Sequence, residues 1–451
     1  MGWKTPYLMI QKGNFFGVQA ISAPIFRNIC LKTRWVLSFS TLKVGIILQN
    51  IRKEWCNMNI KKQLQNLYLY EIISGLQIVD AVWVLLLLSR GFSLAQTGIA
   101  EGFFHVVSMC CEIPSGMLSD MIGRKKTLIL AGLVSAAGSL CMIATDWFGV
   151  ILVAMGLNAF SYNLVSGTRE ALTYDSLLES GQEERYLKVS CIQENIYLGV
   201  FALTNLLTVV TVTLGYRKAY LISVVQGLLC SAVAWRLSET KIGREKKKEK
   251  LTLADMGREL KNYSVESIRF LVENSLVCRR MLVCGAVSAG CYIVYMMMQE
   301  HLVECGLSAK WVGIPLLVLS LFSMAGATLG EKMGRVNLRK LLFFGGLLTC
   351  LFISASGSSV LIVSVLAAGL AHGLEEMLML RIENENQKMF SSEIRATMVS
   401  VSSMLYSVFM VVLSPVAGWI AKEYSIAAAF TGLGIFAAGM VCVFVLWERK
   451  E

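Results

Sequence analysis

The strongest constraint in this sequence is a series of apolar stretches, each about as long as a bilayer is thick. A membrane-spanning helix needs about 20 predominantly apolar residues. Twelve stretches meet this requirement, at residues 66–88, 95–118, 127–145, 147–172, 189–212, 217–236, 280–302, 309–330, 338–356, 359–381, 396–421 and 425–447. The sequence therefore predicts an all-α membrane protein with twelve transmembrane helices.

The composition excludes other classes of protein. Charged residues make up only 16% of the 451 residues, whereas soluble domains contain about 25%. Five prolines in the whole chain leave little room for loops. Disordered chains, collagen-like chains and disulfide scaffolds are all excluded on these grounds.

The basic residues predict the orientation of the helices, because cytoplasmic loops of membrane proteins are enriched in Lys and Arg. Basic residues gather in every second connection and in the long middle connection, which includes the run Lys246–Lys248. We expect these connections and both termini to face the cytoplasm, with the protein in the plasma membrane. No nucleic-acid-binding motif accompanies the basic run, so nucleic acid is not an expected partner.

The chain lacks the sequence patterns of metal sites and of common catalytic sites. Most of its 13 cysteines lie in or beside apolar stretches, it has only three histidines, and it has no Cys-x-x-Cys pair. It also has no phosphate-binding glycine-rich loop and no nucleophile elbow. We therefore expect no metal, no cofactor and no enzymatic activity.

The two halves of the sequence contain matching short motifs. The connection after the second stretch reads Gly-Met-Leu-Ser-Asp-Met-Ile-Gly-Arg-Lys over 116–125, and Ala-Thr-Leu-Gly-Glu-Lys-Met-Gly-Arg over 327–335 stands at the equivalent place in the second half. A second match aligns Gly167–Glu170 with Gly373–Glu376. These matches predict two bundles of six helices related by pseudo-symmetry.

The segment 116–125 resembles the loop signature of the major facilitator superfamily, G-x-x-x-D-[RK]-x-G-R-[RK], with Met121 where a basic residue is usual. Residues 112–116, Glu-Ile-Pro-Ser-Gly, resemble an element that precedes the signature in one subgroup. The resemblance implies an N-terminal six-helix bundle at 58–238, a cytoplasmic central loop at 239–278 and a C-terminal six-helix bundle at 279–451. It also implies a secondary transporter that works by alternating access.

In that superfamily the signature holds the outward-facing state together, and the resemblance assigns this latch to Gly116, Asp120, Gly123, Arg124, Lys125, Glu331 and Arg335. Gly116 is expected to allow close approach of a neighbouring helix, and Gly123 to allow a turn with positive φ. Asp120 is expected to accept hydrogen bonds from a helix N-terminus or from Arg124. Arg124 and Lys125 are expected to pair with acids on adjacent helices or to bind the anionic leaflet.

Polar residues within the stretches are candidates for transport, because charges inside a bilayer are costly and usually functional. The resemblance implies that the first, fourth, seventh and tenth helices line a central cavity. The candidates for contact with substrate or protons are Gln77, Asp80, Arg169, Glu170, Tyr295, Gln299, Glu375 and Glu376. The alternative for these residues is ion pairing between helices. Gln77 and Asp80 are one helical turn apart and are expected to share a face, and Arg169 or Glu170 is expected to pair with an acid of the first or tenth helix.

Residues 1–57 fit none of these patterns, since they carry eight basic residues and one acid. They are either a basic, transit-like extension or a segment preceding a true start at Met58.

The chain is expected to act as a monomer on a small molecule, with protons as the coupling ion. Tyr292, Tyr295 and Met296–Met298 suit a cavity for varied apolar ligands, which favours efflux of amphipathic compounds; the alternative for the methionines is packing. Import of a sugar, amino acid or other metabolite is the competing function, and a non-transporting membrane sensor is the alternative from another class.

Overall fold

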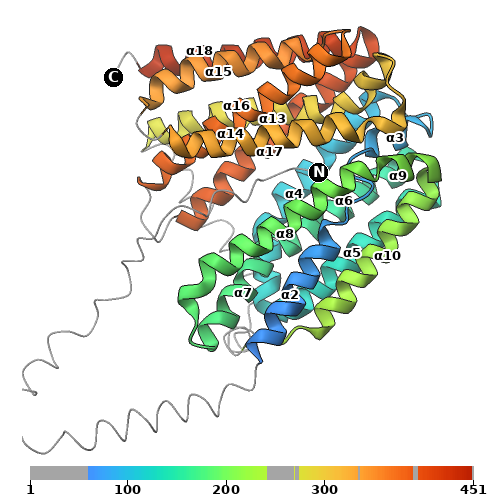
Figure 1. Ribbon diagram of the computed structural model, residues 1–451, viewed down its shortest axis with the longest axis vertical. Coiled ribbons are helices and arrows are strands. Elements are labelled where there is room, and N and C mark those ends of the chain that lie inside the picture. The colour runs from blue at the N-terminus through green and yellow to red at the C-terminus, as the bar shows by residue number, and fades with distance from the viewer. Residues whose placement is uncertain (1–58, 241–268, 270–273, 334–335, 390–394, 449–451) are drawn as a thin grey trace, which may run out of the picture.

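The computed structural model describes residues 59–240, 269, 274–333, 336–389 and 395–448. These residues fold into two helical bundles that lie side by side, and they contain no β-strand (Figure 1). The first bundle contains α2–α10 and the second contains α13–α18. Residues 1–58, 241–268 and 270–273 lie outside the described residues, and so do the predictions for the first 57 residues and for most of the central loop.

Each stretch predicted to span the membrane is mostly helical in the structure, although some are interrupted. The first bundle is built from α2 (Ile60–Gly75), α3 (Trp83–Leu88), α4 (Leu94–Ile122), α5 (Arg124–Ala144), α6 (Phe148–Val165), α7 (Thr168–Glu179), α8 (Tyr186–Leu206), α9 (Thr208–Leu214) and α10 (Tyr216–Arg236). The second is built from α13 (Ser275–Glu304), α14 (Gly313–Lys332), α15 (Leu338–Ala355), α16 (Leu361–Gln387), α17 (Arg395–Glu423) and α18 (Ile426–Glu448), with the short helix η3 (Ala309–Trp311) before α14.

Nine helices of the described residues are long and apolar enough to cross a membrane, and the bent pair formed by α8 and α9 would make a tenth. The two remaining predicted spans, 66–88 and 95–118, are not among these helices, and the reason differs between them. The first is broken between α2 and α3. The second corresponds to α4, where Glu101, His105 and other polar residues lower the mean hydropathy.

The prediction of one continuous helix over 66–88 is therefore wrong. The chain turns between Gly75 and Trp83, and the turn is held by hydrogen bonds from other helices. The Thr211 hydroxyl of α9 donates to the Ile78 carbonyl at 3.1 Å, which satisfies a backbone acceptor freed by the break. Irregular backbone is tolerated inside a membrane where neighbouring helices supply such partners.

The two bundles contact each other mainly at the end that carries α3, α9 and η3 (Figure 1). There α4 packs against α17, α8 against α14 and α9 against η3. Glycines bring the backbones close together: a Cβ on Gly98 would lie 2.4 Å from the Ser414 carbonyl oxygen, and one on Gly313 would lie 1.8 Å from that of Asn205. With the orientation predicted from the basic residues, this closed end is the extracellular one.

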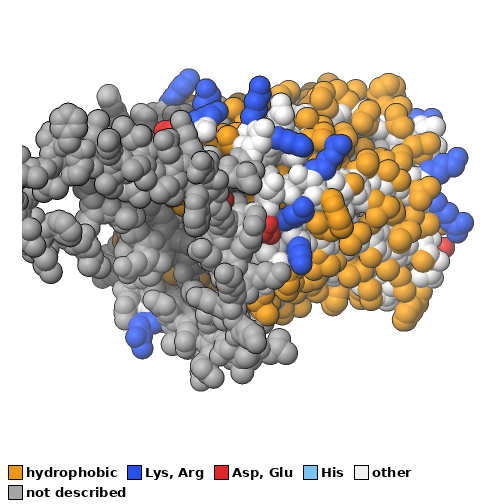
Figure 2. Space-filling model, turned by 90° about the horizontal axis from the view of Figure 1, so that it is seen from below, with side chains coloured by type: hydrophobic (Ala, Val, Ile, Leu, Met, Phe, Trp, Pro, Cys, Tyr) orange, Lys and Arg blue, Asp and Glu red, His pale blue; other side chains and the backbone are white. Residues whose placement is uncertain are grey.

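The surface of the molecule matches a membrane setting. Figure 2 shows a broad band of hydrophobic side chains on one face, with Lys and Arg side chains along its edges. Large apolar side chains such as Leu203, Phe344 and Ile435 are more than 60% exposed. Lipid contact accounts for exposed apolar side chains of this size and number.

Candidate functional site

The break between α2 and α3 carries the two polar residues that were predicted from the first span. Gln77 and Asp80 lie in the turn, so the expectation that they share one face of a helix is wrong. The Asp80 amide donates to the Gln77 carbonyl at 3.1 Å, as in a turn. The Gln77 side chain accepts a 3.4 Å hydrogen bond from the Tyr197 hydroxyl of α8. Because the helix is broken here, side chains and backbone groups of the turn both contact neighbouring helices.

Opposite this turn, α13 of the second bundle presents Tyr295 and Gln299, which are one helical turn apart. The Gln299 side chain accepts a 3.1 Å hydrogen bond from the Val84 amide in the first turn of α3. This contact joins the two bundles and places the α13 face beside the α2–α3 turn. His372 of α16 lies next to Tyr295, with ring centroids 6.1 Å apart and an edge-on angle of 83°.

Three polar atoms in this region are buried without a hydrogen-bond partner among the described residues. They are the Tyr295 hydroxyl, the Gln299 side-chain nitrogen and His372 Nε2. Buried polar groups in proteins are nearly always hydrogen-bonded, so unpartnered ones gathered in one place need an explanation. A bound polar molecule would supply the missing partners.

Arg169 lies in the first turn of α7 and pairs with acids from two other helices. Its guanidinium is 2.9 Å from the Glu71 carboxylate of α2 and 3.8 Å from that of Glu194 of α8. Gln193 also donates to Glu71 at 3.2 Å. The expected pairing of Arg169 with an acid of the first span is thus met by Glu71, while Glu170 lies beside it, half-buried, in the same turn.

Sequence reasoning placed Glu71, Gln193 and Glu194 within spans but did not assign them to a site. Each is buried, and Glu71 is 0% exposed. The signal available from sequence was the presence of acids in two apolar stretches and of an arginine, Arg169, in a third. Which acid meets the arginine depends on how the helices pack, so the sequence alone left the partner open.

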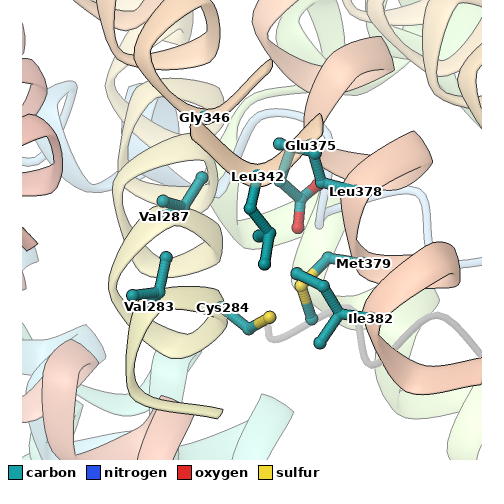
Figure 3. A pocket seen from close by; sticks show the side chains of 9 residues that line it. All are labelled: Val283, Cys284, Val287, Leu342, Gly346, Glu375, Leu378, Met379 and Ile382. Atoms are coloured by element: carbon teal, nitrogen blue, oxygen red, sulfur yellow. The ribbon is translucent and has the colours of Figure 1, made fainter. Parts of the chain in front are cut away.

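The surroundings of Glu375 and Glu376 of α16 differ from those of Arg169 and its acids. The Ser288 hydroxyl of α13 donates a hydrogen bond to the Glu375 carboxylate. Figure 3 shows Glu375 at a small cavity that is otherwise apolar, lined by Val283, Cys284, Val287, Leu342, Gly346, Leu378, Met379 and Ile382. The cavity volume is about 10 Å³, which is close to the minimum needed to hold one water. Glu376, the next residue, is half-buried.

The methionines of α13 are part of the hydrophobic core. Met296, Met297 and Met298 are all 0% exposed and pack within the main core cluster. The alternative interpretation of these residues, helix packing, is therefore confirmed, and they do not form an adaptable lining for apolar ligands.

The signature loop forms a compact set of contacts within the first bundle. Gly123 has a φ of 93°, which confirms the expected turn with positive φ. The Arg124 side chain donates to Asp175 and to the Ala171 carbonyl, both of α7. Pairing of Arg124 with an acid on an adjacent helix is thus confirmed, with Asp175 as that acid.

The N-terminus of α5 is occupied by a carboxylate that sequence reasoning missed. The Lys125 amide donates to the Glu239 carboxylate, after the end of α10, at 3.0 Å. A negative group at this position is stabilised by the free amides and the dipole of the helix. Asp120, expected in this role, lies half-buried in the last turn of α4.

The close approach expected at Gly116 is wrong for this conformation. A Cβ at Gly116 would meet no described residue within 4 Å, because the contacts between the bundles lie toward the other end of α4. Of the second-half latch residues, Arg335 lies outside the described residues, and the side chain of Glu331 does too. Among the residues that are described, no group of three or more His, Cys, Asp and Glu is placed to hold a metal ion.

Comparisons with known proteins agree on one family. The family model described as Major Facilitator Superfamily matches residues 72–386, which is more than half of the chain. An uncharacterized MFS-type transporter of Bacillus subtilis (strain 168), YxaM, is 26% identical over 105 residues, which are 23% of this chain and 26% of that relative. The match thus spans about a quarter of the relative's length.

Solved structures share the fold at low sequence identity. The nucleoside transporter NupG superposes with a TM-score of 0.69 and 12% identity, covering 87% of this chain and 99% of that one. A D-xylose-proton symporter superposes with a TM-score of 0.64 and 12% identity, covering 86% and 98%.

Proposed function

The chain belongs to the major facilitator superfamily, and from that premise we propose that it imports a neutral, ring-bearing polar solute together with protons. Membership makes it a multi-pass membrane transporter and not an enzyme. The observation that carries the substrate proposal is the set of buried, unpartnered polar atoms on Tyr295, Gln299 and His372. Gln299 is bonded to the first turn of α3, where the two bundles meet, and His372 lies against Tyr295, one helical turn from Gln299.

The chemistry of this region favours a neutral substrate. A hydroxyl, an amide nitrogen and an imidazole nitrogen offer both donors and acceptors, and the rings of Tyr292 and Tyr295 lie nearly parallel, with centroids 6.4 Å apart and an angle of 28°. Such a surface suits stacking on a ring with polar substituents. The nearby arginine, Arg169, is already paired with Glu71 and Glu194. Nucleosides and pentoses fit this description, and two proteins of similar fold carry such names.

Efflux of amphipathic compounds is less well supported. Its main sequence argument was an adaptable methionine surface on α13, and those methionines are fully buried in the core. Residues 414–418, Ser-Pro-Val-Ala-Gly, resemble part of a drug-antiporter motif, but they lie on α17. The motif belongs in the fifth span, which contains no proline.

Proton coupling is proposed for the acids of the two bundles. Glu375 is hydrogen-bonded to a neutral serine in an apolar cavity, and Asp80 lies in the broken helix. A carboxylate in such surroundings is costly to keep ionised, so its protonation changes with its exposure to water. Alternating access supplies that change, since each side of the site opens in turn.

We further propose that the protein is a monomer in the plasma membrane with both termini in the cytoplasm. In this orientation the structure is inward-facing, because the bundles are in contact at their extracellular ends. We also propose 58–238 as the N-terminal domain, and we propose that the C-terminal domain begins with α13 at Ser275, four residues before the predicted boundary of 279.

Uptake by proteoliposomes tests the substrate class. Labelled nucleosides and pentoses are expected to accumulate, whereas organic anions and amphipathic cations are not. Tyr295→Phe keeps the ring and removes one hydroxyl, so we expect the KM to rise about fivefold for the loss of a neutral hydrogen bond of about 1 kcal/mol. Tyr424→Phe, in the exposed α17–α18 connection, is the matched control. Uptake of only amphipathic cations would overturn the proposal.

A pH gradient tests the coupling in the same vesicles. Replacing Asp80, Glu375 and Glu376 with amides is expected to abolish gradient-driven accumulation and to leave exchange of substrate intact. Glu304→Gln at the exposed end of α13, where the side chain is 53% exposed, is the control. Gradient-driven uptake that is unchanged in the triple variant would refute the coupling.

A further inference from the structure

Gln299 of α13 takes part in both the substrate region and the closed contact between the bundles. Its Oε1 atom accepts a 3.1 Å hydrogen bond from the Val84 amide, in the first turn of α3. Tyr295, one helical turn earlier on α13, belongs to the proposed substrate region. A single side chain therefore connects the state of the contact with the place assigned to the substrate.

The contact fixes how the Gln299 amide is turned. The oxygen and nitrogen of a side-chain amide are alike in size, so their positions are assigned from the hydrogen bonds that they can make. The Val84 amide can only donate, and of the two Gln299 atoms only Oε1 can accept. Nε2 thus occupies the other position of the amide, and its N–H groups need an acceptor elsewhere.

Closure of the empty site leaves this nitrogen buried without an acceptor. Gln299 is 0% exposed, and Nε2 has no hydrogen-bond partner among the described residues. Separation of α3 from α13 would let water reach the amide and accept from Nε2. A buried donor that loses water and gains no partner shifts an equilibrium by a factor of about 5–150. Because the same amide makes the contact with α3, this cost falls on the closed state.

A substrate that accepts a hydrogen bond from Nε2 would remove the cost. A carbonyl or hydroxyl oxygen of the solute takes the N–H group while Oε1 stays on the Val84 amide. The solute then binds more tightly to the closed state, where it fills a missing partnership, than to the open state, where it only replaces water. By linkage, the solute raises the closed-to-open ratio by the same factor.

We propose that Gln299 makes closure of the extracellular end depend on bound substrate. The inference rests on the proposed function, since it takes the substrate to be a neutral solute with oxygen acceptors. The unpartnered N–H group holds the empty carrier back from closing, and the loaded carrier is free of this penalty. The substrate is expected to raise the closed-to-open ratio at least about fivefold.

The test measures closure in the full chain. Trp147, before α6, and Tyr424, after α17, are 71% and 74% exposed and suit replacement by spin-labelled cysteine. The other cysteines are replaced by alanine, and electron–electron distances are recorded in lipid nanodiscs with and without uridine or D-xylose. The measured quantity is the closed-to-open ratio with the solute divided by the ratio without it, which we call the closure factor.

Gln299→Met keeps the length of the side chain and removes both polar atoms of the amide. The closure factor is expected to be at least about five in the parent and to fall about fivefold or more in this variant. A residue that only supports α3 would change the ratio without solute and leave the closure factor unchanged. A residue that binds the solute equally in both states would change the affinity, measured by equilibrium binding, and also leave the closure factor unchanged.

Gln226→Met is the matched control, because the Gln226 amide also bonds to the end of a broken helix. It donates to the Ile73 and Ser74 carbonyls at 3.0 and 3.2 Å, all within the first bundle. This variant is expected to keep the closure factor of the parent.

The outcomes separate this proposal from the proposed function. A parent that transports uridine or D-xylose with a closure factor near one would overturn the proposal and leave the proposed function standing. The parent closure factor in Gln299→Met would do the same. If neither solute binds to the parent, the proposed substrate class fails and the proposal fails with it. If Gln299→Met does not fold, Gln299→Leu serves for the same comparison.

Discussion

Replacement of Gly98 by valine is the sharpest test of the closed contact between the bundles. A Cβ at this position would lie 2.4 Å from the carbonyl oxygen of Ser414, 3.0 Å from its carbonyl carbon and 3.3 Å from the Pro415 Cα. All three are backbone atoms of α17. No change of side-chain rotamer relieves such a contact, so α17 has to move away from α4.

The cost of the valine follows from this geometry. Contacts shorter than 3.0 Å to a Cβ are essentially never seen, so the helices must separate by roughly an ångström, and overpacking of this kind costs about 1–3 kcal/mol. The cost applies only while α4 and α17 are in contact. A penalty of about 2 kcal/mol shifts the balance about 30-fold toward the state with this end open.

Two measurements check the shift. Spin labels at Trp147 and Tyr424 are expected to report longer distances in Gly98→Val, and transport is expected to fall because the closed state is rarely reached. Gly439→Val is the control: Gly439 is exposed on α18, and its Cβ would meet no described atom within 4 Å. Unchanged distances together with wild-type transport in Gly98→Val would refute the reasoning.

Three further outcomes are expected. Gly123→Ala places a side chain at a φ of 93° and should lower the stability by about 1–3 kcal/mol, measured as a lower Tm in detergent; an unchanged Tm would count against the strained turn. Arg169→Gln leaves the fully buried Glu71 without its cation and should cost about 3–5 kcal/mol, and adding Glu71→Gln should restore most of the Tm. Gly326→Val would place a Cβ 1.8 Å from the Gly373 carbonyl oxygen and should abolish monodisperse protein in size-exclusion chromatography; a normal elution profile would show that α14 and α16 can separate.

The first span shows where prediction from sequence fails. Its hydropathy correctly identified an apolar, helical stretch, but its helix is interrupted between Gly75 and Trp83. No proline lies in this stretch to mark the break. The interruption is possible because Thr211 and Gln299, more than 120 positions away, supply hydrogen-bond partners for Ile78 and Val84. Information about those partners is absent from the local sequence.

The signature loop shows the opposite case. The turn at Gly123 was predicted because glycine adopts a positive φ without steric cost, and the structure has this φ at Gly123. The preference belongs to the residue itself and depends on no distant partner. The partners of the loop were predicted less well. Asp175 and Glu239 are 51 and 114 positions from the residues they contact, and only the packing of α7 and α10 against α5 brings them there.

The sequence by itself determined the helical class, the positions of the apolar stretches and the family, because partition into a bilayer depends on the composition of each stretch and the signature is a short local motif. The tertiary structure alone decided which polar residues meet. Glu71 and Arg169 are 98 positions apart, and His105 and Ser407 are 302 apart. In an apolar interior each buried polar group must find a partner, and the packing of the helices determines which partner is within reach.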